Sequence, residues 1–260
     1  MGRKLILSML ACSTLAIAAE PQERIVESIL PALTYGQSCW STIDLHNLGD
    51  RQVAAEVEAH RASGALVPLT GHPQVTVRIA PGERASYRLE IDEETGDAWV
   101  KIREMVPTRR MFPVLAVSGT TECTNTSQLK TTAREVVYPM RNPWFTGEVG
   151  DLPGDMVAVV NTSERPAKAS LCYSAGNLYS VPNGQRTAQL APICSQAMEA
   201  MIPPFGARQF PVQRDGSSHF HLKTQGDAIA LEMLKPVESG VKLYTVDSTI
   251  KFGGEFANQK

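Results

Sequence analysis

The chain has 260 residues, of which 43% are hydrophobic and 6% aromatic, and its 25 Lys and Arg against 27 Asp and Glu give a net charge of −2. A chain of this length forms one large domain or two of ordinary size. The slight acidity argues against nucleic acid or anionic lipid as the main partner.

Residues 1–19 (MGRKLILSMLACSTLAIAA) have the features of a secretory signal peptide. Two basic residues precede an apolar stretch that is shorter than the ~20 residues of a membrane span, and Ala16-Ile17-Ala18 supplies a small-residue cleavage pattern. An N-terminal anchor helix and a lipoprotein signal at Cys12 are the alternatives. We expect an exported protein, secreted or periplasmic, whose mature chain has a net charge of −4 and no membrane span.

Apolar and polar residues alternate through much of the segment that ends at Cys123. The alternation at Ile43 and Leu45 resumes at Val53, after a turn that contains Asn47. This period of two is typical of a strand with one packed and one solvated face, and Asn suits the turn between two such strands. About seven short strands of this kind predict an immunoglobulin-like β-sandwich over residues 20–123.

The same order of features returns 114 residues further along, where Asn161 stands in the place of Asn47. Strand-like runs flank this second asparagine, and Gly206 lies near the place of Gly82. We therefore expect an all-β chain of two tandem immunoglobulin-like sandwiches after a cleaved signal peptide. The expected boundaries are a linker at 124–134, a second sandwich at 135–250 and a C-terminal tail at 251–260.

Residues 45–53 (LHNLGDRQV) and 77–83 (VRIAPGE) carry a resemblance to a known group of proteins. They are similar to the L-x-N-x-G-D-x-P-V and V-x-L-A-P-G-E units of secreted bacterial proteins built from tandem immunoglobulin-like repeats. The second half departs from this pattern, because Phe205-Gly206 replaces Pro-Gly-Glu and residues 178–200 form an insert. The resemblance implies the fold, and it brings no catalytic or ligand residues with it.

Four cysteines remain after removal of the signal peptide, and an even number in an exported chain indicates disulfides. In a sandwich whose strands alternate in direction, Cys39 at the start of the second strand can meet Cys123 at the end of the seventh. Cys172 lies on the outward face of its strand, where it can tether the loop that carries Cys194. We expect the pairs Cys39–Cys123 and Cys172–Cys194, one in each half.

Two tryptophans and two histidines are candidate binding residues. Trp99 and Trp40 could contact a sugar or a protein partner, but the simpler interpretation is that the neighbouring domain or an edge loop covers Trp99. His219 and His221 lie on the same face of one strand at a spacing that suits two ligands of a zinc or copper ion. The simpler interpretation is that both histidines are solvated surface residues.

No nucleophile, base and acid stand in a recognisable catalytic pattern, so we expect no enzyme activity and no cofactor. The expected function is binding, adhesion or scaffolding in the periplasm or outside the cell, with an unidentified protein or glycan as partner. One alternative is a periplasmic assembly chaperone that donates a strand, with Arg109-Arg110 and the strand after them as a crude match. A further alternative is metal binding by His219 and His221.

Overall fold

The structure is a computed structural model that describes residues 23–36, 38–89, 96–108, 113–125, 128–148, 156–174, 196–212 and 219–234. All regular secondary structure in these residues is β-strand, which confirms the predicted all-β class. Nothing in the described part of the chain is a helix of the length and apolarity needed to cross a membrane. The predicted signal peptide, Cys12 and the expected tail at 251–260 lie outside the described residues.

The strands of the first half form two antiparallel sheets that face each other across a core. One sheet has the order β1-β7-β3-β4, with β5 also paired to β3, and the other has the order β6-β2-β8-β9. Side chains from both sheets meet in one buried apolar cluster, which includes Leu33, Ile43, Val57 and Val100. The strands are β1 Glu23–Tyr35, β2 Cys39–Asn47, β3 Val53–Arg61, β4 Leu66–Val67, β5 Gln74–Ile79, β6 Arg84–Leu89, β7 Gly96–Pro107, β8 Leu115–Asn125 and β9 Gln128–Glu135.

The second half repeats this architecture. Its sheets have the orders β10-β15-β12-β13 and β14-β11-β16, and Val157, Leu171 and Phe220 belong to the buried cluster between them. Each strand of the second half corresponds to one in the first half, with β10 in the place of β1 and β16 in the place of β8. Strands β4 and β9 of the first half have no counterpart among the described strands of the second. The strands are β10 Trp144–Glu148, β11 Met156–Asn161, β12 Ala167–Ser174, β13 Gln196–Ile202, β14 Ala207–Pro211, β15 His219–Gln225 and β16 Ile229–Leu234.

Strand order differs from that of an immunoglobulin constant-type sandwich at the first and last strands, and also at β5, which pairs with β3 and not with β6. In that sandwich the first strand belongs to the sheet of the second, and the seventh belongs to the sheet of the sixth. Here β1 instead pairs with β7, and β8 pairs with β2. The second half makes the same exchange, since β10 pairs with β15 and β16 pairs with β11.

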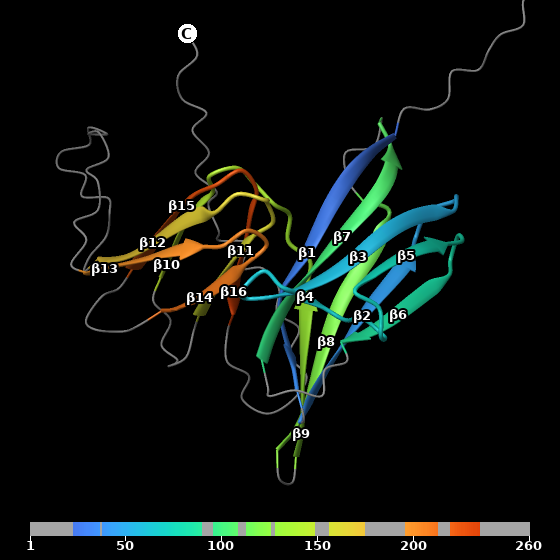
Figure 1. Cartoon of the computed structure of the whole chain (residues 1–260), viewed down its shortest axis with the longest axis horizontal. Helices are drawn as coiled ribbons and strands as arrows, with labels where there is room; N and C mark the ends of the chain where they lie inside the picture. The colour runs from blue at the N-terminus through green and yellow to red at the C-terminus, as the bar shows by residue number, and fades with distance from the viewer. Residues whose placement is uncertain are drawn as a thin grey trace, which may run out of the picture.

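Residues 124–134, expected to be a polar linker, are largely paired. They belong to the hairpin of β8 and β9, whose register runs from Asn125 opposite Gln128 to Ser118 opposite Glu135. The hairpin extends below the rest of the first half in Figure 1. The many threonines in this segment suit a strand, and the polar composition that suggested a linker reflects its place at the edge of a sheet.

A buried asparagine occupies the same place in both halves and explains the repeated turn. The side-chain amide of Asn47 donates to the carbonyls of Arg51 (2.7 Å) and Ile79 (2.9 Å). That of Asn161 donates to the carbonyls of Arg165 (2.7 Å) and Pro203 (2.9 Å). Each asparagine thus connects the turn after its own strand to the turn that follows β5 or β13.

The two halves pack against each other along β1 and β7, which lie between them in Figure 1. Ile29 and Trp99 of the first half meet Val160 and Ala230 of the second in a small buried cluster. Ala32 of β1 similarly packs with β11 and β16. The outer face of the β1-β7-β3 sheet is therefore partly covered by the second half.

Candidate functional site

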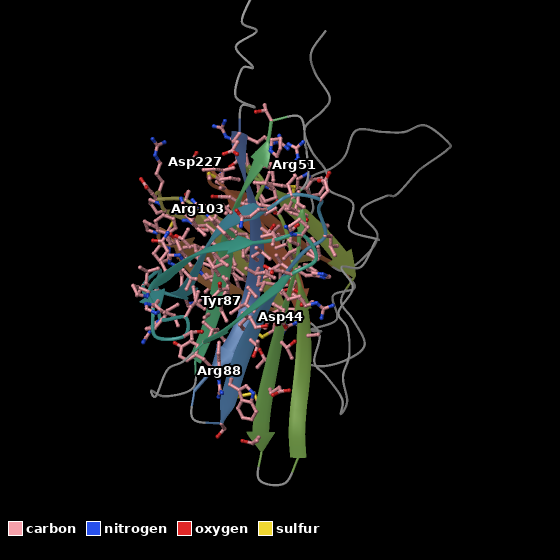
Figure 2. The ribbon with its side chains drawn as sticks, turned by 90° about the vertical axis from the view of Figure 1, so that its right-hand side faces the viewer. Asp44, Arg51, Tyr87, Arg88, Arg103 and Asp227 are labelled. Atoms are coloured by element: carbon pink, nitrogen blue, oxygen red, sulfur yellow. A yellow bond between two sulfur atoms is a disulfide. The ribbon has the colours of Figure 1, made fainter. Side chains whose placement is uncertain are left out.

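The outer face of the β1-β7-β3 sheet carries charged side chains in rows set by the strand register. One row places Ile29 of β1 beside Lys101 of β7 and Glu58 of β3. The next row places Glu27 beside Arg103 and Glu56. Figure 2 shows Arg103 well separated from Asp44 and Arg88, which belong to the other sheet of this sandwich.

Glu58 is the centre of an ion-pair network on this face. Its carboxylate lies 3.3 Å from the Lys101 ammonium and 3.2 Å from the Arg103 guanidinium. Arg103 also binds Glu56 at 2.7 Å. Burial alone raises the pKa of the Glu58 carboxyl, but the two cations outweigh burial, and the net pKa lies below the ordinary value.

The turn at Phe205 closes over this network from the second half. Its carbonyl accepts a hydrogen bond of 2.9 Å from the Trp99 indole, and its ring lies 4.6 Å from the Lys101 ammonium. The ring also stacks on His60 with centroids 5.4 Å apart, while Trp99 stacks on His60 at 4.6 Å. These aromatic and cation contacts fix the turn on the sheet face.

His60 is almost fully enclosed by these neighbours. Its Nδ1 lies 3.2 Å from the Gly64 carbonyl, and its Nε2 lies 3.5 Å from the Glu58 carboxylate, too far for a good hydrogen bond. Burial lowers the pKa of the imidazole, and this effect exceeds the opposing influence of the Gly64 carbonyl and of Glu58. His60 is consequently held as the neutral form at neutral pH.

A groove of about 660 Å³ lies beside this network, at the N-terminal half of β1. Four consecutive β1 residues line it, so the groove runs along the edge of the strand and not over one face alone. The remaining lining residues come from β7, from the segment that precedes β8 and from the segment that follows β9. The lining residues are Arg24, Ile25, Val26, Glu27, Arg103, Pro113, Tyr138 and Pro139.

Large apolar side chains are exposed around this groove. Ile25 is 59% exposed and lies directly opposite Met105, which is 48% exposed, on the neighbouring strand β7. Tyr138, which lines the groove, is 45% exposed. An exposed apolar cluster beside a groove is typical of a surface that contacts another molecule.

Neither tryptophan that the sequence singles out is a free surface residue. Trp99 points outward from its own sandwich, as predicted, but its exposed fraction is 0% because the second half covers it. Trp40 is half-buried, donates to the Glu122 carboxylate at 2.6 Å and lies under the Arg88 guanidinium. Trp99 thus joins the two halves, in agreement with the simpler interpretation that the neighbouring domain covers it, and its burial leaves no surface for contact with a sugar or a partner.

One member of the histidine pair is not a solvated surface residue. His221 is buried, opposite Cys172 of β12 and Thr146 of β10. The side chain of His219 lies outside the described residues. Among the residues whose positions are described, no group of three or more His, Cys, Asp or Glu could hold a metal ion.

The cysteines agree with the predicted pairing as far as the structure describes them. Cys39 and Cys123 form a disulfide between facing positions of β2 and β8. Cys172 is also disulfide-bonded, although it is buried and not solvated. Cys194 lies outside the described residues, so its pairing with Cys172 stays a prediction.

Several residues of this region cannot be found from sequence patterns. The sequence requires a strand before Cys39 but assigns no role to Arg24 or Ile25. The residue pattern of a strand does not indicate whether its edge is paired with another strand. His60 and Phe205 are 145 positions apart and meet only through tertiary packing. The replacement of the Pro-Gly-Glu turn by Phe205-Gly206 was the one signal that the sequence offered.

Comparison with models of known protein families, with curated proteins and with solved structures finds no match to this chain.

Proposed function

We propose that this chain is an exported, non-catalytic β-sandwich protein that binds another polypeptide at the groove along β1. The observation that supports the proposal is the groove itself, in which a strand edge, exposed Ile25 and the cation Arg24 lie together. Strand edges and exposed apolar side chains are the features by which extended polypeptides are recognised. A polypeptide partner is favoured over a glycan because the buried Trp99 cannot stack on a sugar.

The chaperone alternative finds less support in the strand that the sequence suggested. Donation of a strand requires a free edge, but β8 pairs with β2 over Leu115–Cys123 and with β9 over Ser118–Asn125, which leaves only 115–117 unpaired on the β9 side among the described residues. Arg109 and Arg110 lie outside the described residues. If the protein acts in assembly, β1 is the better candidate for pairing with a partner.

Site-specific photo-crosslinking in the source cells tests the proposal. A photoreactive residue at position 25 should produce a discrete adduct with another polypeptide, identified by mass spectrometry. Position 48 is the matched control, because Leu48 is 66% exposed and does not line the groove. A glycan adduct, equal adducts from both positions, or no adduct from position 25 would contradict polypeptide binding at the groove.

A further inference from the structure

The register of β1 on β7 identifies which backbone groups face the groove. Ile29 exchanges two hydrogen bonds with Val137, of 2.9 and 2.8 Å, and these point away from β7. In an antiparallel pair the direction of the backbone groups alternates along the strand. Because the register from Glu23 to Leu30 is unbroken, the N–H and C=O groups of Ile25 and Glu27 also point away from β7.

No strand pairs with this part of β1 in the described portion of the chain. β1 is the terminal strand of its sheet, and the bridge at Ile29 is its one contact of this kind along the outer edge. Two residues beyond Val137 the neighbouring segment reaches Pro139, which has no N–H to donate. The backbone groups of Ile25 and Glu27 are therefore left as a template for an added strand.

Arg24 adds a specific electrostatic requirement at the same edge. It lines the groove, and its Nε is buried without a hydrogen-bond partner among the described residues. The neighbouring cation Arg103 is already bound to Glu56 and Glu58. Arg24 is thus the cation that is available for an incoming carboxylate.

We infer that residues 23–28 of β1 accept an extended strand of a partner polypeptide, with an acidic side chain of that strand at Arg24. This inference rests on the proposed function and names the kind of partner. Main-chain hydrogen bonds from Ile25 and Glu27 supply the affinity, while the exposed Ile25–Met105 pair receives an apolar side chain. Charge complementarity at Arg24 distinguishes acidic strands from others.

Substitution by proline separates the backbone contribution from that of the side chain. The probe is a soluble fluorescein-labelled peptide that alternates Val and Thr around one Asp, and the protein is the full mature chain. Ile25→Pro removes an N–H that faces the groove and leaves the bonds to β7 in place. Ile25→Ala removes the same side chain but keeps the N–H, so it is the matched control.

We expect Ile25→Pro to bind the peptide roughly fivefold or more weakly than Ile25→Ala, the loss typical of a main-chain hydrogen bond. Arg24→Gln should abolish the preference for the Asp peptide over its Asn counterpart. Circular dichroism confirms that each variant is folded. Equal binding by the proline and alanine variants, or no binding of the peptide to the unaltered protein, would overturn strand addition.

Hydrogen exchange distinguishes the partner strand from other occupants of the edge. In the free protein the amides of Ile25 and Glu27 should exchange quickly and become protected on peptide binding, whereas those of Val26 and Ser28 are protected throughout. Protection of Ile25 and Glu27 in the free protein would show that the chain covers its own edge. A dimer that Ile25→Pro dissociates would show that a second copy does. Either result rejects the inference, and an adduct at position 25 would still support polypeptide binding there.

Discussion

His60 lies where the contact between the halves meets the ion-pair network. Trp99 and Phe205 both stack on its ring, and the charged groups that face it are Glu58 on its own strand and Lys101 on β7. Its imidazole bonds to a backbone carbonyl of the first half. Protonation of His60 would place a cation in a buried site next to Lys101.

We expect the stability of the protein to decrease as the pH falls below about 6.5, the ordinary value for His. The folded-state pKa of His60 lies below that value because burial disfavours the cation. The unfolded chain therefore binds the proton first, and stability present above pH 6.5 is lost as the pH falls towards the folded-state pKa.

The urea midpoint measured between pH 7.5 and pH 5.5 checks this prediction. His60→Phe keeps an aromatic ring between its neighbours and cannot titrate, so its midpoint should fall less over the same range. That range also stays above the window in which Glu58 titrates, since its pKa is lowered from 4.5. Parallel curves for both proteins would contradict the assignment to His60.

The turns after β5 and β13 occupy equivalent places in the two halves, but only the turn after β13 takes part in the contact between the halves. In the first half Gly82 has φ of 75°, as the third residue of a tight turn closed by a bond from Glu83 to Ala80. In the second half the equivalent bond runs from Gly206 to Pro203, which puts Phe205 in the place of Gly82. Gly206 was expected there, and the one-residue difference is visible only from the hydrogen bonds.

Phe205 has φ of 53°, a left-handed conformation that glycine adopts without cost. We expect Phe205→Ala to lower the free energy of unfolding by about 1–3 kcal/mol, less than for a fully buried Phe because this one is half-buried. Phe205→Gly loses the same ring but relieves the left-handed backbone, so it should be more stable than the alanine variant by about 1 kcal/mol.

Gly82→Ala supplies the matched control for this comparison in urea unfolding. A Cβ at position 82 has no heavy atom within 4 Å, so the substitution reports the conformational cost alone. It should cost about 1 kcal/mol, the same as the difference between the two Phe205 variants. A Phe205→Ala variant as stable as Phe205→Gly would show that the backbone relaxes at this turn.

At the scale of the whole molecule, the chain is a duplicated sandwich whose two halves supply different parts of the region around the groove. Both halves share one strand order, and each has its own buried apolar cluster. The first half supplies the groove along β1, and the turn at Phe205 in the second half covers the end of the same sheet. The groove and the contact between halves thus lie on neighbouring rows of one sheet.

Non-reducing peptide mapping should find one disulfide in each half, with Cys172 linked to Cys194. The Cys39–Cys123 bond closes a separation of 84 residues, and chain entropy predicts a contribution of roughly 4.5 kcal/mol. Replacing both of these cysteines by serine should lower the free energy of unfolding by up to that amount in urea. A link from either of them to Cys172 or Cys194 would reject the pairing.

The sequence by itself determined the features that depend on neighbouring residues. Alternation with a period of two identified buried positions such as Ile43, Val57 and Val100, because a strand places successive side chains on opposite faces. The second Asn161 turn revealed the repeat, since the same turn chemistry recurs at each copy. The Cys39–Cys123 pair followed from strand direction alone.

Only the tertiary structure decided which strands lie side by side. Alternation has the same form whether β1 joins β7 or β2, because it records faces of a strand and not the partners at its edges. For that reason the sequence left open whether Trp99 is covered, and it did not reveal that no strand in the described part of the chain pairs with the outer edge of β1 at Ile25. Hydrogen bonds and packing between segments far apart in the chain settle both.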